Sequence, residues 1–123
     1  HPIETLLSGY QLCAATEGKS RSAIQIVVSS VAYFRDFLVT AGQSTDVGEV
    51  GPHVLRAYIL YLQQKPCFAS HRFNRPLEKK LSGHTVNCYL RSLRIFFSWL
   101  VAEEIIASNP FDRVKIPRPP RKV

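Results

Sequence analysis

The chain has 123 residues, 46% of them hydrophobic, and its 16 Lys and Arg against 9 Asp and Glu give a net charge of +7. This length suits one domain, and this apolar content can close a helical core without metals or disulfides. No apolar run approaches the roughly 18 residues of a membrane helix, and the start lacks the basic and apolar regions of a signal peptide. We therefore expect a soluble, cytoplasmic protein with no membrane partner.

The cysteines and the first residue bear on the origin of the chain. Cys13, Cys67 and Cys88 are an odd set without framework spacing, which is typical of reduced thiols in a cytoplasm rather than of a disulfide-linked extracellular module. The chain begins at His1 and contains no Met. We therefore expect it to be a fragment of a longer protein.

Positive charge is concentrated in the second half of the chain. Up to Gln64 there are four Lys and Arg against five Asp and Glu, whereas from Lys65 onward there are twelve against four. This asymmetry favours a polyanionic partner, because neutralising phosphates releases counterions and steers association. The alternative is a helical protein-interaction module with a basic surface.

Two helices are predicted in the first third of the chain. Apolar side chains recur at helical spacing from about Ile3 to Ala15, and Gly18 ends that helix. A serine of residues 19–22 is expected to cap the second helix, which stops at Gly42. The side chains expected to face the core are Ile3, Leu6, Leu7, Tyr10, Ile24, Val27, Val28, Val31, Phe34 and Leu38.

A third helix follows a turn-rich linker. Pro52 suits its first position, and Lys65-Pro66 ends it. The sequence CFASHRFNRPLEKKLSG then forms a long basic loop, and loops of this length in a compact domain are often functional. The residues of the third helix expected in the core are Val54, Leu55, Tyr58, Ile59 and Leu62.

The fourth predicted helix starts between Ser82 and Thr85 and is expected to run to Asn109-Pro110. At 100° per residue, its apolar side chains form one face and its polar side chains form the opposite face. No strand alternation is present, so we predict an all-α bundle of four or five helices. The apolar face holds Val86, Tyr89, Leu90, Leu93, Phe97 and Leu100, and the polar row holds His84, Asn87, Arg91, Arg94 and Ser98.

The segment SGHTVNCYLRSLRIFFSWL and the exit IIASNPFDRVKIPRPPR, in this order after the first three helices, resemble the N-terminal core-binding domain of tyrosine recombinases, the phage integrase and Xer class. The resemblance covers nearly the whole chain. It implies a SAM-like helical domain over residues 1–108 that clamps duplex DNA at a recombination site. It also implies a linker over residues 109–123 to a separate C-terminal catalytic domain, and other recombinase protomers as partners on DNA.

The resemblance implies DNA contacts from the start of the second helix and along the fourth. Helix N-termini also offer free amides to phosphates, which explains Ser and Thr at these positions independently. In the tail, prolines would hold an extended connector near the DNA backbone. The implied DNA-binding residues are Lys19, Ser20, Arg21, Ser22, Gln25, Lys80, Ser82, His84, Thr85, Asn87, Arg91, Arg94, Arg118, Arg121 and Lys122.

We expect no catalysis, cofactor or small-molecule substrate in this chain. In the resembled family the tyrosine nucleophile and its arginine, lysine and histidine partners belong to the separate catalytic domain. The string His53-Val54-Leu55-Arg56 matches a catalytic H-x-L-R pattern, but it stands too early and lacks its partners. We interpret it as a histidine near a helix start and an exposed arginine.

A zinc site is a possible reading of Cys67, His71, His84 and Cys88, which have suitable chemistry for four ligands. The pairs lack the tight Cys-x-x-Cys spacing, and the resembled family needs no metal in this domain. We therefore predict no metal site, and we interpret Cys88 as a small side chain at the helix flank.

Three further interpretations compete with DNA contact. Arg91 and Arg94 could form an ordinary solvated helix face, and a helix-turn-helix factor would need two helices joined by a three- or four-residue turn, which no predicted pair has. Phe96, Phe97 and Trp99 could stack on bases, but their spacing favours the core. We expect Phe96 or Trp99 to be partly exposed and to meet a neighbouring protomer.

Overall fold

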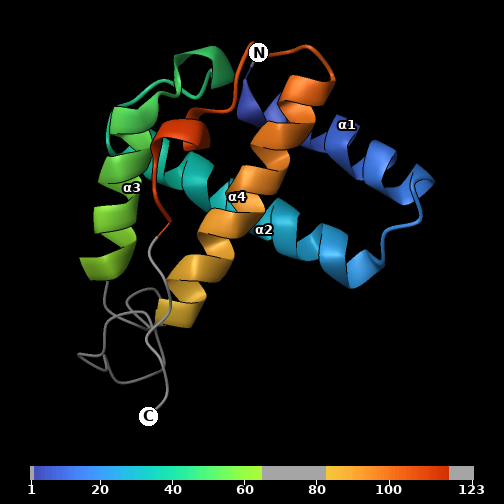
Figure 1. The fold of residues 1–123 in the computed structure, drawn as a ribbon, viewed down its shortest axis with the longest axis horizontal. Coiled ribbons are helices and arrows are strands. Elements are labelled where there is room, and N and C mark those ends of the chain that lie inside the picture. The colour runs from blue at the N-terminus through green and yellow to red at the C-terminus, as the bar shows by residue number, and fades with distance from the viewer. Residues whose placement is uncertain (1, 65–82, 117–123) are drawn as a thin grey trace.

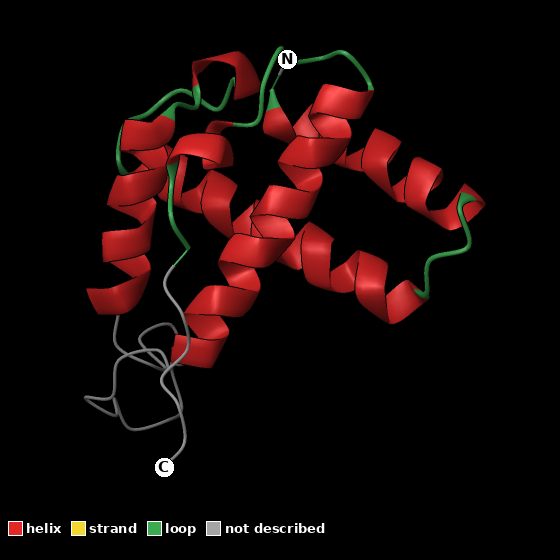
Figure 2. Cartoon of the chain, viewed as in Figure 1, coloured by secondary structure: helices red, strands yellow, loops and turns green. Residues whose placement is uncertain are grey.

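The computed structural model describes residues 2–64 and 83–116, which form four α-helices and two short 3-10 turns (Figure 1). Within those residues there is no strand, and Figure 2 shows helices joined by loops. This confirms the prediction of an all-α bundle with four main helices. The elements are α1 (Ile3–Thr16), α2 (Arg21–Thr40), η1 (Val47–Glu49), α3 (Pro52–Gln64), α4 (Gly83–Ala102) and η2 (Pro110–Arg113).

The helix α2 lies at the centre of the arrangement, because it contacts both α1 and α4. In Figure 1, α1 and α2 run antiparallel, α4 crosses over α2, and α3 lies at the far side from α1. The turn η2 contacts α3 and α4 and fills the angle between them. The last part of the described chain therefore closes the side of the bundle on which α3 lies.

The joint between α1 and α2 is shorter than the sequence suggested. Only residues 17–20 separate the two helices, so the expectation that no pair is joined by a four-residue turn is wrong. Their antiparallel arrangement (Figure 1) differs from the crossing of about 90–120° in a helix-turn-helix. The pair is an αα-hairpin.

Aromatic side chains from α1, α2, α3 and α4 meet in the core. The ring of Phe34 lies 4.8 Å from that of Tyr58 and 6.4 Å from that of Phe97, and Tyr10 lies 5.9 Å from Phe96. Phe96 and Phe97 are fully buried, so neither is placed to stack on bases. Of Phe96 and Trp99, one of which is expected to be partly exposed, Trp99 is the half-buried residue.

The predicted core faces agree with the observed burial. The predicted residues that are half-buried rather than buried are Leu7, Ile24, Val28, Val54 and Tyr89, and the others are buried. By length and composition α2 is also apolar enough to cross a membrane. Core helices of water-soluble proteins pass the same test, and the buried side chains of α2 include Val27, Val31, Phe34 and Leu38, so we assign α2 to the core.

Three helices end in the same hydrogen-bonded motif, in which an amide bonds a carbonyl five residues earlier across a residue with positive φ. At the end of α1 the Lys19 amide donates to the Ala14 carbonyl at 3.1 Å across Gly18, and α2 ends likewise at Gly42. At the end of α4 the Ile105 amide donates to Leu100 at 2.9 Å across Glu104, whose φ is 61°. The prediction that the fourth helix runs to Asn109-Pro110 is therefore wrong, since α4 ends at Ala102.

Residues 109–116 return over the bundle and pack on it. Phe111 is 2% exposed, and its ring lies 6.1 Å from that of Phe97. Arg56 of α3 donates from its guanidinium to the Arg113 carbonyl at 3.0 Å. The first half of the segment expected to be a linker is thus held against α3 and α4, while residues 117–123 lie outside the described part.

Candidate nucleic-acid interface

The start of α2 is a capped helix N-terminus. Ser20 has an extended backbone, and its hydroxyl oxygen accepts a hydrogen bond from the Ala23 amide at 3.1 Å, which confirms the predicted serine cap. The amides of Arg21 and Ser22 also lack partners within the helix, as at any first turn. Both residues are exposed, so this end of α2 can receive an anion.

Lys19 precedes the cap and connects this helix start to α4. Its ammonium lies 5.8 Å from the centroid of the Tyr10 ring, a cation–π distance. Lys19 and Arg94 line one depression of about 420 Å³ between α1 and α4, together with Glu17 and Trp99. The structure therefore brings Lys19, just before α2, and Arg94 of α4 to a common surface.

The predicted row of polar side chains on α4 has an outward-facing middle part and a C-terminal end that bonds another segment of the chain. Arg91 and Arg94 are exposed, and Thr85 and Asn87 are half-buried. Ser98, at the end of the row, accepts a hydrogen bond from the Asn109 side-chain amide at 3.1 Å. The middle of the row faces outward, whereas its C-terminal end holds the returning segment in place.

The other predicted residues either do not line the depression shared by Lys19 and Arg94 or lie outside the described part of the chain. Gln25 is exposed, and its amide donates to the Ser29 hydroxyl at 2.9 Å along α2. The side chain of His84 is outside the description, although its backbone belongs to α4. The predicted DNA-binding residues that lie outside the described part are Lys80, Ser82, Arg118, Arg121 and Lys122.

The residues of the H-x-L-R string and the described residues of the zinc hypothesis lie on different elements. His53 is exposed near the start of α3, and Arg56 is exposed and donates to the backbone of η2, which agrees with the interpretation of a histidine near a helix start and an exposed arginine. Cys67 and His71 of the zinc hypothesis are outside the described residues, and Cys88 is exposed. In the described ranges, no three His, Cys, Asp or Glu side chains are grouped as metal ligands.

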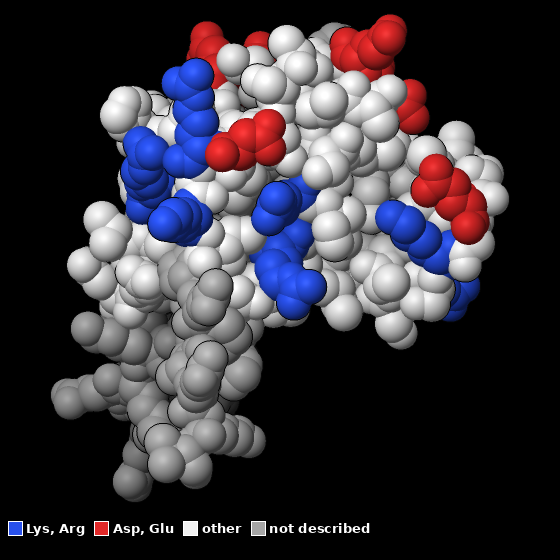
Figure 3. All heavy atoms as spheres, in the orientation of Figure 1, with Lys and Arg blue, Asp and Glu red and all other residues white. Residues whose placement is uncertain are grey.

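Basic side chains occur in three places on the face that α4 crosses (Figure 3). They lie over α4, near the α1–α2 turn, and over α3 and η2. The third group consists of Arg56, Arg113 and Lys115, which line one depression. No sequence pattern marks this group, because Arg56 is 57 residues from Arg113 and meets it only when η2 packs on α3.

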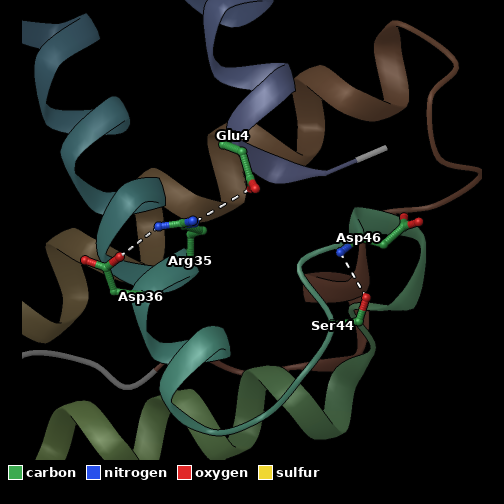
Figure 4. Close-up of polar contacts among 5 residues, drawn as sticks. All are labelled: Glu4, Arg35, Asp36, Ser44 and Asp46. Carbon is green, nitrogen blue, oxygen red and sulfur yellow. Dashed lines mark hydrogen bonds and ion pairs between the residues drawn. The ribbon is translucent and has the colours of Figure 1, made fainter.

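Arg35 and Asp46 each interact with neighbouring groups (Figure 4). Arg35 lies 3.7 Å from Glu4 and 3.5 Å from Asp36, so it joins α1 to α2. Asp46 donates from its amide to the Ser44 hydroxyl at 3.1 Å. The Gly48 amide, which donates to the Asp46 carboxylate at 2.8 Å, holds the pKa of this carboxyl below its ordinary value. These groups stabilise the fold and do not extend the basic face.

A family model described as the phage integrase SAM-like domain matches residues 10–116. The chain belongs to this family. The predicted resemblance to the N-terminal domain of phage integrases and tyrosine recombinases is thereby confirmed. No curated protein sequence matches the chain, and no solved structure does.

In its described part, this phage integrase SAM-like domain presents groups that can bind an anion. Its exposed face presents guanidinium and ammonium groups, a capped helix start, and shallow depressions between helices. The family match includes no catalytic domain. The groups present can neutralise phosphates and donate hydrogen bonds to base edges or phosphate oxygens.

Proposed function

We propose that this chain is the DNA-binding arm of a site-specific tyrosine recombinase or integrase and that it clamps duplex DNA at the recombination site without catalysing a reaction itself. The observation that supports this most is the outward exposure of Arg91 and Arg94 on α4, with Lys19 lining the same depression as Arg94. Strand cleavage would belong to a separate catalytic domain. This role agrees with a cytoplasmic location.

The proposed mechanism separates positioning from base reading. Lys19, Arg21 and the first amides of α2 contact phosphates and fix the register of the domain on the duplex. The helix α4 enters the major groove, where Arg91 or Arg94 can bond both acceptors of a guanine and Asn87 can bond an adenine. Asn87 lies four residues before Arg91, and Arg94 lies three residues after it, so the three share one side of α4; the two arginines are exposed and Asn87 is half-buried.

The test is a fluorescence-anisotropy titration of the chain with a duplex of moderate length over a series of salt concentrations. Binding should weaken linearly in log salt, and Arg91→Ala with Arg94→Ala should weaken binding. A lost phosphate contact lowers the salt slope by about one, and a lost base contact costs about 1–3 kcal/mol and relaxes specificity. If the double variant leaves both affinity and slope unchanged, the assigned face is wrong.

Charge-conserving variants separate the two kinds of contact. Lys retains the positive charge but loses the planar fork that bonds guanine at two points. Arg91→Lys and Arg94→Lys should therefore keep the salt slope while reducing discrimination between sequences at a base-reading position. Thermal unfolding of each variant checks that the fold is unchanged.

A contact with another protein is the second candidate function, and one observation favours it. Trp99 is half-buried between α1 and α4, where its ring lies 5.6 Å from that of Tyr10, measured between centroids. Leu12 and Ile95, which line depressions beside Trp99, are 69% and 45% exposed. Absence of DNA binding even at low salt would favour this function, and a second recombinase protomer is the partner that we propose for this surface.

A further inference from the structure

A depression of about 510 Å³ between α3 and η2 combines positive charge with an apolar floor. Its rim holds Arg56, Arg113 and Lys115, and its floor holds Ile59, Leu60 and Val114. Leu60 is 56% exposed, so apolar surface is accessible between the cations. We call this feature the α3–η2 depression.

Two of these cations, Arg113 and Lys115, belong to residues 109–116, which hydrogen bonds and burial hold against the bundle. Asn109, 9% exposed, donates from its side-chain amide to Ser98 and to the Arg94 carbonyl and accepts from the Phe111 amide at 2.9 Å. Burial of Phe111 fixes η2 further. The positions of Arg113 and Lys115 are therefore set by the fold.

The backbone after η2 directs Lys115 outward. Val114 has φ −122° and ψ 129°, an extended conformation, and side chains alternate between two faces along an extended chain. Val114 and Ile116 are half-buried against the core, whereas Lys115 is exposed. Arg56 is oriented by its hydrogen bond to the Arg113 carbonyl, so the three cations lie around one opening.

We propose that the α3–η2 depression binds the sugar–phosphate backbone of duplex DNA, on the strand that borders the groove occupied by α4. This inference rests on the proposed function and adds a contact surface that α2 and α4 do not supply. Among the described residues, the lining of the depression holds three cations and no acid, and Asp112 precedes Arg113 in η2. The phosphates would meet the cations, and the apolar faces of the deoxyriboses would lie on Leu60 and Val114.

The spacing of the elements agrees with this contact. Helices that pack directly, as α3 and α4 do, have axes about 8–10 Å apart, and the major groove is about 12 Å wide. Figure 3 shows the basic side chains over α4 and those over α3 and η2 on the same face. A duplex that receives α4 in its major groove would thus bring one bordering strand over the α3–η2 depression.

The first experiment removes two cations without touching the hydrogen bond of Arg56. Arg113→Gln with Lys115→Gln should lower the salt slope of duplex binding by about 0.9 for each lost phosphate contact. The Arg113 carbonyl remains, so Arg56 keeps its acceptor, and circular dichroism with thermal unfolding should match the parent chain. An unchanged salt slope and affinity in the folded double variant would overturn the inference.

A matched pair of acid variants tests location rather than total charge. Asp112→Asn, beside the depression, and Asp36→Asn, beside Arg35 on α2, each raise the net charge by the same amount. Asp112→Asn should tighten duplex binding and Asp36→Asn should have little effect. Equal effects of the two variants would overturn the inference, because they would show that only net charge acts.

The outcomes distinguish this inference from the proposed function. If the parent chain does not bind duplex DNA at low salt, both fail. If it binds and only variants of Arg91 and Arg94 weaken binding, the proposed function stands and the α3–η2 depression is not a contact. If Arg113→Gln with Lys115→Gln abolishes binding to a polyanionic peptide but not to DNA, the depression is a protein site and the inference is overturned.

Discussion

At the scale of a single residue, Asn109 connects the segment of residues 109–116 to α4. Its side chain makes hydrogen bonds to Ser98, Arg94 and Phe111 from a buried position. Asn109→Ala should lower the free energy of unfolding by about 2 kcal/mol, because each buried hydrogen bond contributes about 0.5–1.5 kcal/mol. Urea denaturation followed by circular dichroism measures this loss.

Asn109→Asp is the control for that substitution. The carboxylate can still accept from the Phe111 amide, but it cannot donate to the Arg94 carbonyl and places a charge at a buried site facing that oxygen, so at neutral pH the loss of stability should be at least as large as that of Asn109→Ala. If Asn109→Ala unfolds at the same urea concentration as the parent chain, Asn109 does not hold the segment.

Tyr58 is the second residue with a measurable consequence. It is fully buried, and its hydroxyl has no hydrogen-bond partner in the described structure. Burial raises the pKa of Tyr58 well above its ordinary value, which is about 10. Because the folded chain then holds this proton more tightly than the unfolded chain, stability falls as the pH rises above about 10.

Tyr58→Phe removes both the unpaired hydroxyl and this titration. The variant should be as stable as the parent chain or more stable by up to about 1 kcal/mol at neutral pH. Its melting temperature should also fall less between pH 9 and pH 11, values about one unit either side of the ordinary tyrosine pKa. A large destabilisation of the variant at neutral pH would mean that the hydroxyl has a partner.

At the scale of the elements, the ends of α1, α2 and α4 use one motif with different residues. The positive-φ position is glycine after α1 and α2 but Glu104 after α4. A residue with a Cβ in this conformation costs roughly 1–2 kcal/mol. Glu104→Gly should therefore stabilise the chain by about 0.5–1 kcal/mol, after allowance for the greater freedom of glycine in the unfolded chain.

Calorimetric melting temperatures test this expectation, with Glu104→Ala as the matched control. Alanine removes the charge of Glu104 but retains a Cβ at the positive φ, so it should give no comparable gain. Equal stabilisation by Gly and Ala would show that charge, and not backbone strain, decides the effect.

The residues with positive φ at these helix ends also explain which helix boundaries the sequence predicts correctly. Gly18 and Gly42 mark the ends of α1 and α2 in the sequence, because glycine adopts positive φ without cost. Glu104 gives no such signal, so the first visible stop was Asn109-Pro110. The hydrogen bonds of Asn109 to Arg94 and Ser98 join residues in different elements, and local patterns do not reveal such contacts.

At the scale of the whole molecule, the sequence predicts the part of the candidate interface that a single helix forms. It does not predict the parts that form only when separate elements pack together. The exposure of Arg91 and Arg94 follows from the helical period of α4 alone. The depression shared by Lys19 and Arg94, and the one formed by Arg56 and Arg113, depend on how helices and the returning segment pack. The resemblance to integrases implies a DNA-binding face, and the packing of the fold determines which basic side chains lie beside one another.

The most direct test of the account is amide chemical-shift mapping of the labelled chain during titration with duplex DNA at low salt. The account predicts shifts in three places: the start of α2 near Arg21, the exposed side of α4 near Arg91, and residues 113–116. Residues around Glu4 and Arg35, whose charges are paired with each other, should not shift. Shifts confined to that paired region, or none at any position, would contradict the claim that the α4 face binds DNA.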